Sequence, residues 1–220
     1  MDDFEKILAA AGFRVSRRAL DAGYESSATY LSRVWSGHRD VPVQNHVSAI
    51  LATVDPEIPR RIAPPVMAEL VDAYARAALL VPPAVDPSAR AALEALAARG
   101  YTLVVVSNTM RTPGVVLRAL LDRYGLLGFF THTTFSDEIG IRKPDPEIFV
   151  RSLGAVGGDA STAVHVGDDP VLDVEGARRA HMRVIQVRSA PGRSAAGQMP
   201  DAVIPTIGDL PAAVMQLDSQ

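Results

Sequence analysis

The feature that most constrains the fold is an alternation in the second half of the chain, where short apolar runs end in polar residues. The run at 101–106 leads into Ser107 and Asn108, and the run at 163–166 leads into Gly167 and Asp168. Continuous β-branched runs of this kind are found in buried parallel strands. Helical periodicity lies between them. Strands that alternate with helices predict right-handed crossovers and a Rossmann-like, three-layer parallel sheet.

The first 80 residues have a different pattern. Apolar residues at helical spacing predict four helices, within residues 4–11, 16–36, 47–54 and 64–74, and no strand. The character changes at Pro82 and Pro83. A chain of 220 residues can form one large domain and a small one. We therefore expect a small all-helical cap domain at 1–81 and an α/β core domain at 82–220.

Within the core domain, the spacing of apolar residues and the positions of turn residues predict a specific order of strands and helices. Strands are expected at 101–106, 129–135, 163–166, 183–187 and 202–204, with helices at 87–99, 115–124, 146–153, 171–180 and from 209 onward. His165 lies within an expected strand, so we interpret it as a packing residue. The other histidines show no metal-ligand spacing.

Composition excludes several functions. Net charge is −3, so the chain lacks the basic surface that binds nucleic acid or an anionic membrane. No apolar run approaches the ~20 residues that span a bilayer, and the acidic N-terminus does not resemble a signal peptide. We expect a cytoplasmic protein with neither membrane nor nucleic-acid partner; a homo-oligomer stays open. With no cysteine, oxygen ligands are the choice for a cation.

Two polar segments could hold a phosphate. In open α/β sheets, ligands bind beyond the carboxyl ends of the strands. Ser107 and the N–H groups near Asn108 could bind phosphoryl oxygens, although such residues also form ordinary turns. Lys143 lies in the Pro-stiffened segment 140–146 and could neutralise phosphate charge. It is one of only two lysines beside twenty arginines, which suggests a site that requires an ammonium.

A third segment could hold a cation. Asp168, Asp169 and Asp173 place three carboxylates within six residues at the end of an expected strand. Such carboxylates repel one another unless a cation or an ammonium lies between them. A hard cation such as Mg²⁺ takes one or two carboxylates, waters and phosphate oxygens. The alternative is an acidic loop that caps the following helix.

The order, spacing and flanking strands of these segments resemble the haloacid dehalogenase-like (HAD) hydrolase superfamily, in its phosphatase branch with a helical cap. The resemblance implies Asp168 as a direct ligand of Mg²⁺ and Asp169 as a second ligand or a support through water. It implies Asp173 as the partner of a catalytic Lys143. It also implies a small phosphorylated metabolite as substrate. The acidic pair disfavours the dehalogenase branch, whose chemistry needs no metal.

One part of the resemblance is missing. Family members carry an Asp-x-Asp at the end of an N-terminal strand, and its first carboxylate is the nucleophile; no Asp-x-Asp occurs in these 220 residues. By analogy the absent strand is central, between the strands that lead to Ser107 and Asp168. Its loss would leave buried unsatisfied backbone groups, each costing ~1–3 kcal/mol.

Three accounts of this absence stay open. The chain lacks its natural N-terminus, or another segment or subunit fills the gap, or the protein is a non-catalytic HAD-like binding or regulatory module. The first allows a Mg²⁺-dependent phosphatase that works through an aspartyl-phosphate once the strand is present, whereas the last two predict no covalent aspartyl-phosphate. On each account, residues 1–220 alone are expected to show no more than trace hydrolysis.

Overall fold

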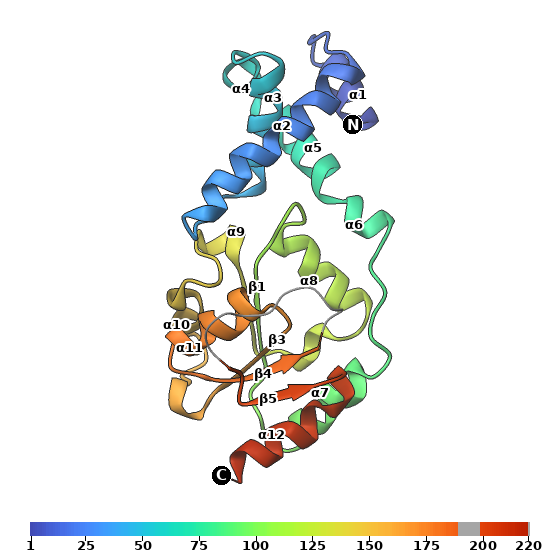
Figure 1. Cartoon of the computed structure of the whole chain (residues 1–220). Coiled ribbons are helices and arrows are strands. Elements are labelled where there is room, and N and C mark those ends of the chain that lie inside the picture. Colours follow the sequence, from blue (N-terminus) through green and yellow to red (C-terminus); the bar gives the residue numbers. More distant parts are fainter. Residues whose placement is uncertain (189–198, 220) are drawn as a thin grey trace. The chain divides into compact units, whose positions relative to one another are not determined.

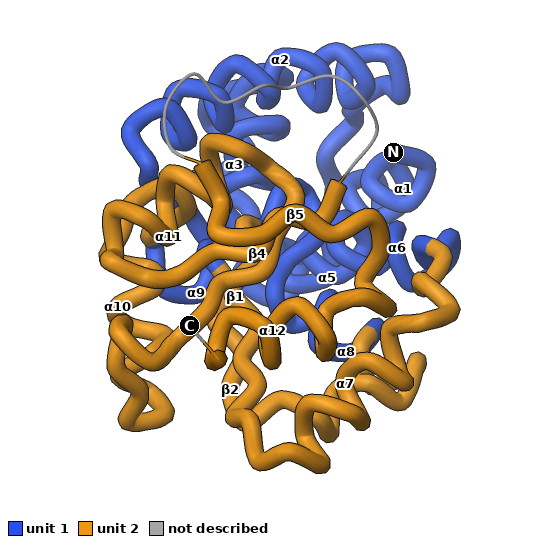
Figure 2. Tube along the Cα trace, turned by 60° about the horizontal axis from the view of Figure 1, so that its bottom comes forward, with its two compact units in different colours: residues 1–83, 109–120, 136–140 blue, residues 84–108, 121–135, 141–220 orange. Residues whose placement is uncertain are grey.

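The computed structural model describes residues 1–188 and 199–219, which form two compact units (Figures 1 and 2). Unit 1 comprises Met1–Pro83, Thr109–Leu120 and Ser136–Gly140. Unit 2 comprises Ala84–Asn108, Leu121–Phe135 and the described residues from Ile141 onward. Unit 1 thus contains two segments from the second half of the chain as well as the first 83 residues. The domain division at 81/82 stays a prediction.

Residues 1–83 are helical and contain no strand, as the sequence predicts. The helices here are α1 (Asp2–Ala10), α2 (Arg17–Ser36), α3 (Val43–Val54), α4 (Ile58–Arg61), α5 (Pro64–Ala75) and α6 (Ala77–Leu80). Ser16 caps α2, because its side chain accepts a hydrogen bond from the Ala19 amide. Proline begins α5, where its missing N–H costs nothing. The short helices α4 and α6 were not predicted.

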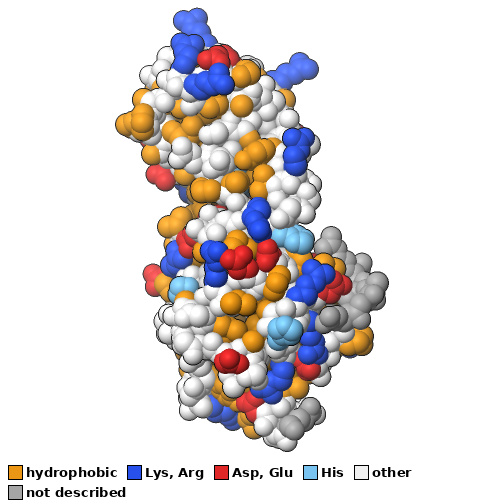
Figure 3. Space-filling model, turned by 90° about the vertical axis from the view of Figure 1, so that its left-hand side faces the viewer, with side chains coloured by type: hydrophobic (Ala, Val, Ile, Leu, Met, Phe, Trp, Pro, Cys, Tyr) orange, Lys and Arg blue, Asp and Glu red, His pale blue; other side chains and the backbone are white. Residues whose placement is uncertain are grey.

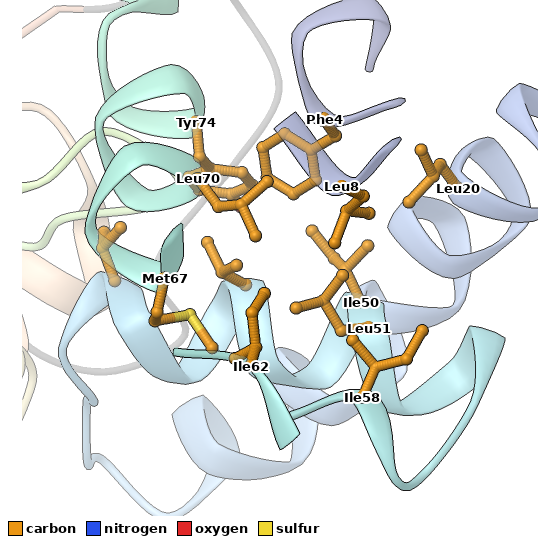
Figure 4. Packing of buried hydrophobic residues seen from close by; sticks show 12 residues of the cluster. Phe4, Leu8, Leu20, Ile50, Leu51, Ile58, Ile62, Met67, Leu70 and Tyr74 are labelled. Carbon is orange, nitrogen blue, oxygen red and sulfur yellow. The ribbon is translucent and has the colours of Figure 1, made fainter. Parts of the chain in front are cut away.

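The helices of unit 1 enclose an apolar core. Phe4 and Leu8 of α1 meet Ile50 and Leu51 of α3 and Leu70 of α5 (Figure 4). All of these side chains are at most 2% exposed. Unit 1 also contains α9 (Ser136–Ile139), which was not predicted, and most of α8 (Gly114–Arg123).

The strands of unit 2 are all parallel, which confirms the predicted α/β class. They are β1 (Val104–Ser107), β2 (His132–Phe135), β3 (Val164–Gly167), β4 (Arg183–Val187) and β5 (Ala202–Ile204). β1 is shorter than the predicted strand at 101–106. The expected strand at 129–135 begins only at His132, because Leu127–Phe129 forms a 3₁₀ turn.

Helices cover both faces of the three-stranded sheet β3–β4–β5 (Figure 1). On one face, Leu96 of α7 (Ala89–Ala97) and Leu210 of α12 (Leu210–Asp218) pack against Ile185 of β4. On the other face lie α10 (Pro146–Gly154) and α11 (Gly176–Arg179). The predicted helix 171–180 is realised as a wide π-type turn, Pro170–Glu175, followed by α11.

The sheet of unit 2 is divided. β1 pairs only with β2, and β3 pairs only with β4 among the described strands, so two sheets result. The valines of β1 are half-buried, whereas the sequence predicts a buried strand. β1 is incompletely buried because one of its edges has no partner strand in the described part of the chain, and the same is true of one edge of β3.

The surface carries charges of both signs. On the face in Figure 3, basic and acidic side chains alternate with apolar ones, and neither sign forms a large patch of its own. Among the described residues, no helix combines the length and apolar character that crossing a bilayer requires.

Candidate functional site

The segment after β1 is held against the segment that contains Lys143. The Asn108 side chain donates from Nδ2 to the Lys143 carbonyl oxygen at 3.0 Å. Its Oδ1 accepts a hydrogen bond from the Lys143 amide at 2.7 Å. Both polar atoms of Asn108 are therefore occupied in fixing the lysine segment. The hydroxyl of Ser107 has only a long contact, 3.5 Å, with the Asn108 carbonyl oxygen.

Lys143 and Asp173 form a buried ion pair. The distance from Lys143 Nζ to Asp173 Oδ1 is 2.5 Å, and the two side chains are 12% and 5% exposed. Lys143 precedes α10, where Asp145 caps the helix and Pro146 begins it. The turn after β3 therefore binds the ammonium of Lys143, while the residue after β1 binds its main chain. This geometry agrees with the predicted pairing of Asp173 with Lys143. The catalytic role of Lys143 stays a proposal.

Sequence reasoning missed a second partner of Asp173. His165, in β3, places Nε2 2.8 Å from Asp173 Oδ1, the same oxygen that Lys143 contacts. The ring packs edge-on against Phe149 of α10, with centroids 4.9 Å apart. His165 is buried, so the packing interpretation was right but incomplete. The sequence did contain a signal for this contact, because His165 is a polar residue within an apolar strand and lies close to an acidic segment.

These contacts set the charges of the cluster. Burial would raise the pKa of Asp173, but the hydrogen bond from His165 and the charge of Lys143 outweigh it and hold the pKa well below its usual range. Burial lowers the pKa of His165, more than the Asp173 carboxylate raises it. At neutral pH the cluster therefore contains an ammonium, a carboxylate and a neutral imidazole.

Gly167 provides the space for this carboxylate. A Cβ atom added at Gly167 would overlap the side chain of Asp173, so a larger residue would displace it. Asp173 Oδ2 in turn accepts a hydrogen bond from the Asp169 amide at 3.0 Å. The Gly-Asp-Asp segment thus wraps closely around Asp173.

The two predicted metal ligands differ in their surroundings. Asp169 Oδ1 accepts hydrogen bonds from the amides of Val171 and Leu172, each at 2.9 Å, and so caps the turn that follows. Asp168 is exposed, and its carbonyl oxygen accepts a hydrogen bond from Gln186. The described residues contain no group of three or more His, Cys, Asp or Glu side chains arranged to hold a metal ion. They offer one accessible carboxylate and one that already serves as a cap.

The residue after Asn108 is fixed in unit 1. The Thr109 amide donates to Ser136 Oγ at 2.8 Å. The buried Asp40 carboxylate accepts hydrogen bonds from Ser136 Oγ at 2.5 Å and from Trp35 Nε1 at 3.0 Å. No sequence pattern indicated these contacts, because the participants are far apart along the chain.

Sequence comparison relates the chain to a known family. The sequence model described as haloacid dehalogenase-like hydrolase matches residues 8–181. The phosphoserine phosphatase of Thermus thermophilus is 36% identical over 125 residues, 57% of this chain and 48% of that protein. The plasmid-encoded phosphoglycolate phosphatase of Cupriavidus necator is 37% identical over 131 residues, 58% of this chain and 54% of that protein. The chain therefore spans about half the length of these relatives.

A solved structure extends the similarity to nearly the whole chain. The 2-haloacid dehalogenase from Pseudomonas syringae superposes with a TM-score of 0.66 at 25% identity, covering 98% of this chain and 89% of that one. The shared fold therefore includes both the helical region and the α/β region.

Proposed function

The chain belongs to the haloacid dehalogenase-like hydrolase family, and on that premise we propose that it serves a phosphatase reaction on a small phosphomonoester. The observation that carries the proposal is the buried ion pair of Lys143 and Asp173, joined to Asn108 through the backbone of Lys143. A phosphate ester is negatively charged and repels an approaching carboxylate. An ammonium held in a fixed place reduces that repulsion without reorganising during the reaction.

The segment after β1 supplies the other side of the phosphate site. The hydroxyl of Ser107 and the amide of Asn108 donate to phosphoryl oxygens, while Lys143 offers its remaining N–H donors; the Thr109 amide is already bonded to Ser136. Ser107 has only one long contact, so its hydroxyl can turn toward a ligand. Asp173 orients the ammonium and does not attack phosphorus, because both of its oxygens already accept hydrogen bonds.

The nucleophile in this proposal is a carboxylate on a strand that pairs with the open edges of β1 and β3. Its oxygen attacks phosphorus in line, the bond from phosphorus to the ester oxygen breaks, and the departing alkoxide takes a proton from water to leave as the alcohol. Water then hydrolyses the aspartyl-phosphate, which releases inorganic phosphate and restores the carboxylate. Neither Asp168 nor Asp173 can substitute for it, since one would hold the cation and the other holds Lys143.

The cation of this proposal is Mg²⁺. Asp168 would bind it directly, and Asp169 would support it through water, since one of its oxygens already caps a turn. Mg²⁺ keeps several waters and commonly uses one or two carboxylates together with phosphate oxygens. The oxygens of Asp168 and Asp169 therefore suit Mg²⁺ once the nucleophilic carboxylate of the additional strand is present. The cation would neutralise charge on the phosphoryl group.

The relatives support the substrate class. The names of the two relatives compared above specify phosphoserine and phosphoglycolate, both small phosphomonoesters. We propose the same substrate class for this chain, and we do not propose either of these two compounds as its substrate. The cytoplasmic location expected from the sequence belongs to the same proposal.

The test compares residues 1–220 with the same chain carrying an N-terminal apolar strand that ends in Asp-x-Asp-x-Thr. With an aryl phosphate and Mg²⁺, the unextended chain should show trace hydrolysis and the extended chain turnover. An extended control with Asn for the first added Asp should be inactive. In the active form, Asp168→Asn should weaken metal binding and reduce turnover. Robust turnover by the unextended chain, abolished by Asp168→Asn, would show that the nucleophile is misassigned.

The second candidate is a non-catalytic HAD-like module that binds a phosphate or another anion at Ser107 and Lys143. The division of the sheet favours it, together with the absence of Asp-x-Asp from the sequence. This candidate predicts that the extended chain binds inorganic phosphate at Lys143 but hydrolyses nothing.

A further inference from the structure

The contacts of His165 set it apart from an ordinary packing residue. Residues along a strand alternate between the two faces of a sheet. Val164 and Val166 pack with the cluster around α7 and α12, so His165 faces the opposite side, toward Phe149 of α10. The sequence thus directs one imidazole into the side of the sheet where Asp173 lies.

The imidazole and the ammonium share one acceptor atom. Asp173 Oδ1 accepts from His165 Nε2 at 2.8 Å and from Lys143 Nζ at 2.5 Å, while Oδ2 accepts from the Asp169 amide at 3.0 Å. Because the carboxylate is ionised, the neutral imidazole must carry its proton on Nε2 to form this bond. Three donors from three segments therefore fix the rotation of one carboxylate.

Two of these donors are held in place independently of the carboxylate. The edge-on contact with Phe149 restricts rotation of the imidazole, and the Asp169 amide belongs to the backbone. Lys143 is different, because four rotatable bonds separate its ammonium from the main chain. The position of Nζ consequently depends on where Oδ1 points, and His165 is the side chain that fixes Oδ1.

We propose that His165 is a positioning residue, which orients Asp173 and through it holds the ammonium of Lys143 in place. That this ammonium then binds a phosphate rests on the proposed function, whereas the positioning itself does not. His165 touches neither substrate nor reacting atoms in this arrangement.

The chain offers a selective probe, since Lys143 and Lys6 are its only lysines. In protein labelled with ¹⁵N-lysine, each ammonium gives its own signal. Lys6 is exposed on α1 and should exchange its protons rapidly with water. Lys143 is 12% exposed and hydrogen-bonded, so its ammonium signal should be shifted and visible. Lys6 is then the internal reference.

Three variants separate positioning from packing. His165→Leu removes the donor, and the Lys143 signal should move toward that of Lys6 or be lost. His165→Gln restores an N–H donor at similar reach, and the signal should return. Ile185→Ala lowers stability from the opposite face of the sheet and should leave the signal unchanged. If the Leu variant does not fold, His165→Asn, whose amide is too short to reach Oδ1, takes its place.

The outcomes are distinct. Loss of the Lys143 signal with Leu or Asn and its recovery with Gln support the proposal. Equal behaviour of the Gln and Leu (or Asn) variants, or a shift with Ile185→Ala as large as with Leu, overturns it. Adding inorganic phosphate tests the proposed function separately. If phosphate does not move the Lys143 signal of the unaltered protein, the anion site fails while the comparison of variants still decides the role of His165.

Discussion

The two units differ in how completely their apolar centres are closed. Unit 1 is organised around hydrocarbon, with Ile50 and Leu70 completely buried among helices. Unit 2 buries His165 and Asp173 beside β3, while the valines of β1 stay half-buried. The comparison teaches that the helices of unit 1 close around an apolar cluster, although the same unit also buries the carboxylates of Asp40 and Asp137. Unit 2 instead places charged groups where a strand edge has no partner among the described residues.

The largest expected effect tests this contrast with one truncation in each unit. Ile50→Ala should cost about 2–5 kcal/mol of unfolding free energy in unit 1, because it leaves a cavity in a closed core. Val105→Ala in β1 should cost only about 1 kcal/mol, because its side chain is only partly buried. Urea denaturation measures both, with the fluorescence of Trp35, the sole tryptophan, following unit 1 and amide signals of β3 and β4 following unit 2. Equal costs would break the comparison.

The second prediction concerns the space beside the charged cluster. Gly167→Ala should destabilise unit 2 by about 1–3 kcal/mol, because the new methyl group overlaps Asp173. Gly128→Ala in the same unit is the control, since nothing lies within 4 Å of its added Cβ. Thermal unfolding should separate the two variants clearly. A neutral Gly167→Ala would mean that Asp173 can move without penalty.

The third prediction is that acid affects the two units in opposite directions. The pKa values of His165 and Asp173 are lowered in the folded protein. The contribution of each group to the free energy of unfolding is therefore complete above its unfolded pKa, about 6.5 for His165 and about 3.9 for Asp173. It is lost as pH falls through the folded pKa. In unit 1, burial raises the pKa of Asp137, with the charges of Glu138 and Asp40 adding to it. Its stabilisation is present below about 3.9 and is lost as pH rises through the raised value.

Denaturation from pH 7.5 down to pH 4.5 measures this difference, with Trp35 reporting on unit 1 and β3 amides on unit 2. Stability of unit 2 should fall on acidification, while the Asp137 contribution strengthens unit 1. Asp137→Asn should flatten the profile of unit 1 and leave that of unit 2 unchanged. Parallel profiles in the two units would contradict the opposite shifts.

The sequence predicted the elements whose signals are local. Helical spacing of apolar residues located α1, α2, α3 and α5, and β-branched runs located β1 and β3, because periodicity follows from which face is buried. The parallel α/β class followed from their alternation. The segments that carry the predicted site residues were found in the same way, since polar residues at strand ends mark the ligand edge of such a sheet.

What could not be predicted depends on contacts between distant segments. The partner of His165 is a carboxylate eight residues away on another turn, and only the wide turn at Pro170–Glu175 brings it back to β3. The half-buried state of β1 depends on a neighbouring strand, which its own sequence cannot indicate. An acidic loop that caps the following helix was the alternative to metal binding. In the structure, Oδ1 of Asp169 does cap the turn that follows.

The smallest expected effect compares one helix cap from each unit. Ser16 in unit 1 accepts a hydrogen bond from Ala19 N at 3.3 Å, and Asp145 in unit 2 accepts one from Glu147 N at 3.0 Å. Removing a cap costs about 0.5–2 kcal/mol. The ionised Asp145 also interacts favourably with the positive end of α10, worth roughly 0.3–1 kcal/mol at low salt.

Asp145→Ala should therefore cost more than Ser16→Ala at pH 7, and salt should narrow the difference because it screens only the charged cap. Urea denaturation at low and high salt, with the same two probes, checks this. A salt-independent difference would mean that the charge of Asp145 contributes nothing and that the shorter hydrogen bond alone distinguishes the caps. In that case the importance of charge in unit 2 would be confined to the buried cluster around Asp173, and would not extend to the start of the helix that follows Lys143.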